Sequence, residues 1–445
     1  MADLAVYAGG ALVRLLLAHY TPLPALLQHR TELSTPLSSW TRLKEGHTLF
    51  TGLSPLTRPQ TPYSSGGSFH HSPLALLLLG PLTDAQQVPE WVSYAVWTLA
   101  DLGVAWAVGR VADRRRRREL LVEEGKTRWS AKRVSALYLF HPFSLFTTLA
   151  RSSITFSNLS VALAVESAIS GSIIPAVFFL SFATHLSLYP ILLLPPLVLL
   201  AHTYRQPPSP SVAADEPSSR SFQAGSSPSL QSSILEGVSG FAVHQGALLG
   251  LSWYLTGHSW SFLSSAYGVN LTIPDLTPNI GLSWYFFIEM FDHFRAFFLV
   301  VFALHPVVYV APLTYFYRKD PLLPLVLLVG SSALLKPYPA LGDWGLWHAL
   351  LGCYSELIPY IPSPLFHLLL PLHALFLLPT FHHLWLVSGS GNSNFFYAST
   401  LVWAIGMGGW IVEVMKGWGR REVVGGLGKE GRERVRKGEW EVVQR

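Results

Sequence analysis

The chain alternates between long apolar stretches and short polar segments. Blocks with hardly a charge run over residues 191–200, 297–310, 322–335 and 365–378. A helix satisfies its own backbone hydrogen bonds, and about 20 apolar residues cross the ~30 Å hydrocarbon layer, so such blocks suit a bilayer. The pattern predicts an all-α polytopic membrane protein with about 11 to 13 membrane-embedded helices.

The apolar blocks also place the individual helices. By residue number, the expected spans are 4–19, 92–111, 134–150, 157–170, 173–188, 190–203, 234–256, 285–316 (in one or two pieces), 321–336, 341–358, 364–386 and 395–416. The apolar run 73–82 is too short to cross alone. We expect it to dip into the membrane and return, or to pack on its neighbours.

The polar segments divide the chain into a multi-spanning domain over residues 1–416 and a basic cytosolic tail over 417–445. Segments 21–72 and 257–280 are the expected luminal loops. The first carries apolar residues at roughly helical spacing, which fits amphipathic helices on the membrane or packing on the bundle; these residues are Leu33, Leu37, Trp40, Leu43 and Leu49. Segment 205–233 is rich in Pro and Ser, so we expect a disordered cytosolic insert.

Composition supports the membrane assignment. Half of the 445 residues are hydrophobic and 13% are charged, against about 25% in soluble domains. The net charge of +5 comes from basic clusters beside apolar blocks, such as Arg114–Arg118, which fits the positive-inside rule better than nucleic-acid binding. The single cysteine, Cys353, excludes an intramolecular disulfide and a zinc ribbon.

Charged residues inside or beside the expected spans are candidates for a role, because a charge in hydrocarbon costs several kcal/mol unless it is paired or hydrated. They are Glu166, Glu289, Asp292, Arg295 and Glu413. Glu289, Asp292 and Arg295 follow each other at intervals of three, so they can share one helix face. We expect a self-neutralising structural cluster there, with a proton or ligand role as the alternative.

Catalytic chemistry has little support in the sequence. A membrane enzyme that transfers sugar from a polyprenyl phosphate needs a carboxylate near its first luminal loop. That loop offers only the isolated Glu32 and Glu45. The histidine pairs at 70–71 and 382–383 do not form chelating pairs, because adjacent helical residues point about 100° apart. We expect no catalytic residue, no metal and no cofactor.

A small, amide-bearing segment precedes the last expected span. Residues 388–394 read Ser-Gly-Ser-Gly-Asn-Ser-Asn, and three aromatic residues follow. The amides of Asn392 and Asn394 can donate to and accept from sugar hydroxyls or phosphate oxygens, while the rings cover apolar faces. A helix-capping turn is the competing interpretation, because Asn is a favoured N-cap.

Two long motifs suggest a family. Residues 274–294 (PDLTPNIGLSWYFFIEMFDHF) and 389–397 (GSGNSNFFY) resemble the U subunit of glycosylphosphatidylinositol (GPI) transamidase. Shorter matches support this resemblance over nearly the whole chain: STPLSSW at 34–40, FHHSP at 69–73, SLYP at 187–190, and KPYP at 336–339 close to Gly342 and Asp343. The chain departs from the family at His71, where the family usually has an acid.

The resemblance implies a fold similar to the GT-C glycosyltransferase-type transmembrane fold of the GPI mannosyltransferases. It implies a non-catalytic subunit of the multi-pass endoplasmic-reticulum membrane, which binds GPI and presents it for attachment to proprotein C-termini. The implied partners are the caspase-like catalytic subunit K, subunits T and S, the GPI-anchor-attachment subunit, the GPI glycolipid and membrane phospholipids. The alternative is a mannosyltransferase of GPI biosynthesis that depends on dolichol-phosphate-mannose.

The resemblance also assigns residues. By match to the family motif, Asn392 and Asn394 would contact GPI. Arg318 resembles a basic family position at the cytosolic end of a span. Its guanidinium is expected to reach a phospholipid headgroup, or simply to anchor the helix end.

Overall fold

The computed structural model describes residues 2–52, 62–63, 68–120, 128–206, 228–362 and 364–436. These ranges contain helices and loops and no strand, which confirms the all-α prediction. The chain divides into two compact units, Met1–Cys353 and Tyr354–Arg445.

The first unit contains most of the helices. In chain order they are α1 (Ala2–Tyr20), α2 (Leu23–Leu27), α3 (Trp40–Gly52), α4 (Pro73–Leu79) with the 3₁₀ turn η1 (Gly80–Thr83), α5 (Glu90–Leu120), α6 (Ala131–Leu139), α7 (Pro142–Leu149), α8 (Ile154–Ile169), α9 (Ile173–Leu186), η2 (Tyr189–Leu193), α10 (Leu194–Arg205), α11 (Leu230–Leu255), the π-helical turn η3 (Leu263–Gly268), α12 (Val269–Thr272), α13 (Ser283–Glu289), α14 (Asp292–Val308), α15 (Val310–Phe316), α16 (Leu322–Leu335) and α17 (Leu341–Gly352).

Helix α5 is central to this unit. It packs on α1, α6 and α8; α8 packs on α9, and α9 packs on α11. α5 carries small side chains, such as Ala105 and Ala107, that are fully buried. Small residues let helix backbones approach closely, which is the usual way that helices associate in membranes.

Five helical segments in the described ranges are long and apolar enough to cross a membrane. They are Glu90–Arg118, Leu230–Leu255, Asp292–Phe316, Pro364–Leu386 and Ser393–Gly426. Shorter apolar helices, α8 and α9 among them, accompany them. The second and third segments expose most of their apolar side chains, as helices that face lipid or a partner do. The chain is therefore a multi-pass membrane protein.

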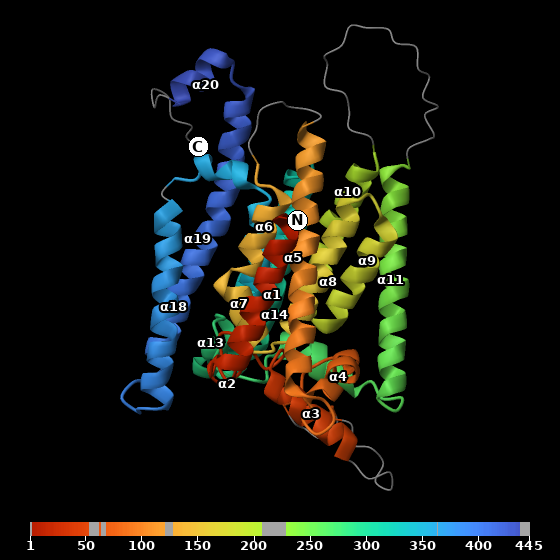
Figure 1. The fold of residues 1–445 in the computed structure, drawn as a ribbon, viewed down its shortest axis with the longest axis vertical. Helices are drawn as coiled ribbons and strands as arrows, with labels where there is room; N and C mark the ends of the chain where they lie inside the picture. The colour runs from red at the N-terminus through yellow and green to blue at the C-terminus, as the bar shows by residue number, and fades with distance from the viewer. Residues whose placement is uncertain are drawn as a thin grey trace. The chain divides into compact units, whose positions relative to one another are not determined.

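The elements of the expected first luminal loop gather at one end of this unit, where Figure 1 shows α2, α3 and α4. Trp40 and Leu43 of α3 are buried in a cluster with Trp97 of α5. Leu33 is 3% exposed, and Leu37 packs on a second cluster, whereas Leu49 is 41% exposed. Of the two interpretations of these apolar residues, packing on the bundle is therefore the correct one for all but Leu49.

Two of the expected spans are broken into shorter helices. The expected span 134–150 is two helices, because Pro142 lacks an N–H and cannot continue α6, and His141 instead caps α7. The expected span 285–316 is three pieces, α13 to α15. The short run at 73–82 starts as a helix capped by Ser72 and packs on α3, α5 and α11. This agrees with the expectation that it would pack on its neighbours.

The second unit is built around two long helices, α18 (Pro364–Leu386) and α19 (Ser393–Gly426), with η4 (Ser355–Tyr360) before them and α20 (Lys429–Arg436) after them. α18 packs along α19. A Cβ added to Gly406 of α19 would lie 2.8 Å from the Pro371 ring of α18, so only glycine permits this approach. α19 continues ten residues past the boundary expected at 416. Residues 207–227 and 437–445, which carry most of the expected insert and about a third of the expected tail, lie outside the described ranges.

Candidate functional site

The amide-bearing segment forms the turn between α18 and α19. It closes the C-terminus of α18: the N–H groups of Val387 and Ser388 donate to the His383 carbonyl, and those of Ser390 and Gly391 donate to the Leu384 carbonyl. Gly389 has φ +64°, a conformation that glycine adopts at no steric cost. The sequence Ser-Gly-Ser-Gly thus makes an ordered turn that fixes where the asparagines begin.

Asn392 is the N-cap of α19. Its Oδ1 accepts hydrogen bonds from the backbone N–H groups of Asn394 at 3.1 Å and Phe395 at 3.4 Å. The helix-capping interpretation is therefore correct. The cap uses only the amide oxygen of Asn392, so the amide nitrogen takes no part in capping. Both Asn392 and Asn394 are exposed, so their amide groups face the surroundings of the turn.

Aromatic rings from both helices surround this turn. Phe395 stacks on Phe381 with ring centroids 5.6 Å apart, and Phe396 meets His382 edge to face at the same distance. Phe396 is fully buried, whereas Phe395 is 52% exposed. The turn therefore presents two amides beside an exposed aromatic face, which is suited to a hydroxylated, amphipathic ligand.

Arg318 follows α15 and is exposed. One guanidinium nitrogen donates to the Tyr315 carbonyl at 2.9 Å, and the guanidinium carbon lies 4.5 Å from the centre of the Tyr315 ring. These contacts hold the side chain against its own helix end. They leave further N–H donors of a five-donor group for an anion.

A buried ion pair that sequence analysis did not single out lies at the centre of the first unit. Arg14 of α1 and Asp101 of α5 are each 1% exposed, with NH2 and Oδ2 2.8 Å apart. Arg14 also donates to the carbonyls of Gly10 and Leu139, and the Tyr138 hydroxyl donates to Asp101 Oδ1 at 2.8 Å. The signal was present in the sequence: each residue is a lone charge in an apolar segment, and the two charges are opposite.

The expected cluster of Glu289, Asp292 and Arg295 is wrong. Glu289 ends α13 and Asp292 begins α14, with Met290 in an extended conformation between them, so the three do not share a helix face. Arg295 instead donates to backbone carbonyls of Phe287, Thr272 and Ile273. It ties α14 to the segment after α12, where Ile273 has the strained φ of +45°.

Three of the other carboxylates singled out from the sequence are paired. Glu166 pairs with Arg110 at 2.9 Å and Arg114 at 3.2 Å. Glu413 pairs with Lys416 and Arg420, and Glu32 pairs with Arg30 at 2.6 Å. These carboxylates have structural partners.

The arginine run that ends α5 is not a uniform basic patch. Arg115 is 2% exposed, donates to the Cys353 carbonyl and pairs with Asp320 at 3.1 Å. Arg117 is largely exposed beside Asp113, and Arg118 lies over the Tyr204 ring. At least one member of the run therefore has a structural role, apart from any effect on topology.

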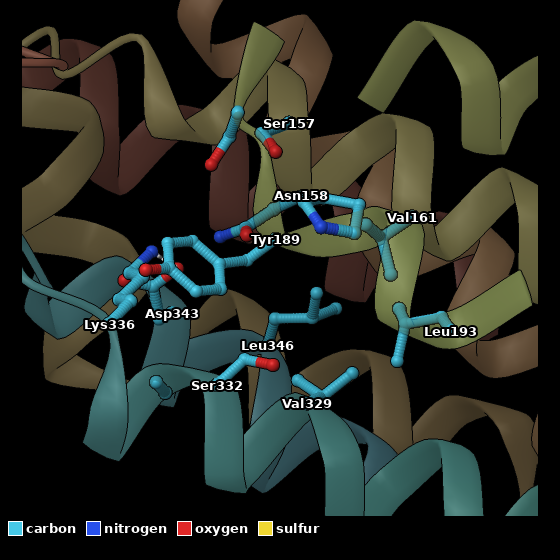
Figure 2. A pocket seen from close by; sticks show the side chains of 13 residues that line it. Ser157, Asn158, Val161, Tyr189, Leu193, Val329, Ser332, Lys336, Asp343 and Leu346 are labelled. Carbon is cyan, nitrogen blue, oxygen red and sulfur yellow. Dashed lines mark hydrogen bonds and ion pairs between the residues drawn. The ribbon is translucent and has the colours of Figure 1, made fainter. Parts of the chain in front are cut away.

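A cavity with polar side chains at one end lies between α8, η2, α16 and α17 of the first unit. Figure 2 shows the Lys336 ammonium against the Asp343 carboxylate, with Asn158 and the Tyr189 ring beside them. Lys336 Nζ and Asp343 Oδ1 are 2.6 Å apart, and Asp343 also accepts from the Ala340 N–H at the start of α17. The cavity offers about 40 Å³ to the centres of water molecules. The KPYP motif thus turns the chain so that Lys336 faces the first turn of the next helix.

A second cavity adjoins the first and shares Ser157, Ser187 and Lys336 with it. Tyr338 and His71 also line it. Behind Tyr338, the Asp275 carboxylate pairs with Arg42 at 2.8 Å. Partial burial alone would raise the pKa of Asp275, but hydrogen bonds from His70 and Thr277 and the charge of Arg42 hold that pKa well below its usual range. Asp275 is therefore a permanent anion that anchors this face.

Within the described ranges, no group of three or more His, Cys, Asp or Glu side chains is placed to hold a metal ion. Cys353 is 5% exposed, which makes it a poor nucleophile.

Comparisons with known proteins agree with the motifs. The family model described as "GPI transamidase subunit PIG-U" matches residues 8–403. The chain is 32% identical over 390 residues to the GPI transamidase component GAB1 of Saccharomyces cerevisiae, covering 87% of each chain. It is 30% identical over 416 residues to the human GPI-anchor transamidase component PIGU, covering 90% of this chain and 89% of the human one.

A homologue of GAB1 in Schizosaccharomyces pombe is 30% identical over 393 residues. These names support a transamidase component and give no support to the mannosyltransferase alternative. With a family match over nearly its whole length, the chain belongs to the PIG-U family of GPI transamidase subunits.

Proposed function

We propose that the chain is an accessory subunit of the GPI transamidase complex that holds the GPI glycolipid through the turn between α18 and α19. The observation that carries the proposal is the exposure of Asn392 and Asn394 where an apolar helix begins. A glycolipid has its hydroxyls and phosphates at the membrane surface and its tails in hydrocarbon. Exposed amides at a helix end, beside the exposed Phe395 ring, match that division.

The chemical step belongs to another chain in this proposal. Transamidation needs a nucleophile, and the one cysteine of this chain is buried. The caspase-like subunit K would cleave the proprotein and pass its new carboxyl to GPI. Subunits T and S and the GPI-anchor-attachment subunit would complete the assembly in the endoplasmic-reticulum membrane. Arg318 would bind a phospholipid headgroup at the cytosolic side.

Amide substitutions test the turn. In cells that lack the native subunit, we expect Asn394→Leu and Asn392→Leu to lower surface delivery of a GPI-anchored reporter. Loss of one hydrogen bond of ~1 kcal/mol corresponds to about a fivefold drop in affinity. Asn392→Ser is the matched control for capping, because a serine oxygen still accepts from the first turn of α19 while the side-chain amide is lost.

Two outcomes distinguish ligand contact from capping. If Asn392→Ser lowers anchoring while the complex assembles at its normal level, the amide itself is required. Normal anchoring by Asn394→Leu and by Asn392→Ser, at normal expression, would overturn the site. Assembly is measured by co-purification of the other subunits.

A further inference from the structure

We propose that the cavity around Lys336 and Asp343 binds a hydroxylated six-membered ring, either a sugar or an inositol. This site lies in the first unit and uses none of the residues of the turn between α18 and α19. The inference therefore does not rest on the function proposed for Asn392 and Asn394.

The charged pair at the cavity is suited to neighbouring hydroxyls. Lys336 Nζ donates and the Asp343 carboxylate accepts, and their side chains are 9% and 14% exposed. A ring hydroxyl can accept from the ammonium while the next hydroxyl donates to the carboxylate. Because the two charges lie 2.6 Å apart and cancel, the pair attracts an uncharged polyol rather than a free anion.

Two further polar groups add capacity for hydrogen bonds. The amide nitrogen of Asn158 donates to the Gly342 carbonyl at 2.8 Å, which orients the amide, and no hydrogen bond from elsewhere in the described chain reaches its oxygen. Ser157 is 7% exposed, lines both cavities, and its hydroxyl bonds to no other described residue. Because Ser157 lines both cavities, its hydroxyl can pair with an occupant of that space.

Tyrosine rings border the same space. Tyr189 lines the first cavity and Tyr338 the second, and they are 8% and 3% exposed. The Tyr338 hydroxyl donates to the Asp275 carbonyl at 2.8 Å, so its ring is held in place. An aromatic face beside polar groups covers the C–H face of a sugar while the hydroxyls meet the polar side chains. Figure 2 shows the Tyr189 ring between Asn158 and the Lys336–Asp343 pair.

The space exceeds what one water molecule requires. The two cavities offer about 40 and 30 Å³ to the centres of water molecules, against the ~10–15 Å³ that one water needs, and they share Ser157, Ser187 and Lys336. The first continues past Leu193 and Val329, whose side chains are apolar. A hydroxylated ring with a hydrophobic substituent fits a cavity that is polar at one end and apolar at the other.

Binding of small probes tests the site directly. The full-length chain, in its complex and in lipid nanodiscs, is exposed separately to methyl α-mannoside, to myo-inositol and to inorganic phosphate. Saturation-transfer NMR then reports which probe binds. We expect binding of the mannoside or of inositol, and the responding probe identifies the class of ring.

Cavity variants locate the binding. Ser157→Ala removes the unpaired hydroxyl and should raise the probe Kd about fivefold. Ser160→Ala is the matched control one turn along α8, because that hydroxyl bonds to the Phe156 carbonyl and lines neither cavity; it should leave the Kd unchanged. Ser332→Leu should abolish binding by filling the space. Ser332→Thr adds a single methyl and replaces Ser332→Leu if that variant does not fold. It should raise the probe Kd without changing thermal stability.

The opposite results would overturn the proposal. These are the absence of ring binding, binding of phosphate alone, or ring binding that Ser157→Ala and Ser332→Thr leave unchanged. Delivery of a GPI-anchored reporter by Asn392 and Asn394 variants is a separate readout, so either idea can fail while the other stands.

Discussion

Arg14 and Asp101 form an ion pair in the middle of the first unit although 87 residues separate them in the chain. The Arg14 guanidinium also donates to the Leu139 carbonyl, and the hydroxyls of Tyr138 and Thr148 donate to the Asp101 carboxylate. One charged pair therefore joins α1, α5, α6 and α7. Its residual donors and acceptors are satisfied, which is the condition under which a buried pair is tolerated.

Removing one partner of this pair is predicted to destabilise the fold. Asp101→Leu leaves the Arg14 charge buried without its counter-ion, and such a loss costs about 3–5 kcal/mol. The double variant Arg14→Met with Asp101→Leu removes both charges and should regain part of that stability. Thermal unfolding of the purified chain in detergent, followed by tryptophan fluorescence, measures the difference.

Arg117→Met is the control for this experiment. Its pair with Asp113 is largely exposed, and such pairs contribute about 0–1 kcal/mol. Equal unfolding temperatures for Asp101→Leu and Arg117→Met would contradict a central role for the buried pair. A double variant less stable than Asp101→Leu would contradict the argument from unpaired charge.

The sequence predicted the helices better than the contacts between their polar residues. Apolar length is a local property, so α1, α5, α18 and α19 follow from about 20 successive residues. Pairing of Arg14 with Asp101 is not local, because it depends on which helices are neighbours. The lone opposite charges indicated that partners were needed, but helix order in space was not available from spacing.

Glycine positions give a prediction about helix packing. A Cβ added to Gly330 of α16 would lie 2.5 Å from Nε1 of Trp347 on α17, and Trp347 is fully buried. We expect Gly330→Ala to lower the unfolding free energy by about 1–3 kcal/mol, because the ring has no room to move. The measurement is again thermal unfolding of the purified chain.

Gly246→Ala provides the matched control. It lies inside α11, where an added Cβ meets no atom within 4 Å. Alanine is the better helix former by about 1 kcal/mol, so this variant should be neutral or more stable. If both variants change stability equally, the close approach of α16 and α17 does not limit the size of residue 330.

Local breaks account for the main error in the candidate site. Glu289, Asp292 and Arg295 have the spacing of one helix face, and that spacing predicted an internal charge cluster. The helix breaks at Met290, so residues three apart on either side of the break no longer lie on one helix face. The asparagine turn was located correctly because Gly and Asn mark turns by their own conformational preferences.

Arg318 gives a prediction about lipid. If its remaining N–H donors hold a phospholipid headgroup, Arg318→Gln should reduce the phospholipid that co-purifies with the complex, because a neutral amide holds a phosphate less strongly than a guanidinium does. Lys319→Gln, at the adjacent exposed position, is the control for loss of one positive charge. Mass spectrometry of extracted lipid provides the measurement. Equal lipid loss in both variants would indicate general anchoring by positive charge.

His71 makes stability depend on pH. Its side chain is 2% exposed, and its Nε2 contacts the Ser39 carbonyl at 3.1 Å. Burial lowers the pKa of His71 from 6.5 to about 4; the hydrogen bond to Ser39 opposes this shift, and the charges of His70 and Arg42 add to it. The folded protein therefore keeps a neutral imidazole under conditions in which the unfolded chain takes up a proton.

The sign of the effect follows from linkage. Above pH 6.5 the imidazole is neutral in both states, so its contribution to stability is fully present. As pH falls from 6.5 toward 4, only the unfolded chain binds the proton, and unfolding becomes easier. At pH 5.5, one unit below the unfolded pKa, the loss is about 1.4 kcal/mol.

His71→Gln removes the titrating group while its amide nitrogen can still donate to Ser39. We expect the variant to lose less stability than the parent between pH 7 and pH 5, whatever its stability at pH 7. His29→Gln replaces an exposed histidine and should keep the parent's pH dependence. Thermal unfolding at intervals of half a pH unit separates the curves. Parallel curves for the parent and His71→Gln would mean that another group causes the acid sensitivity. The burial of a neutral His71 would then not make the free energy of unfolding depend on pH.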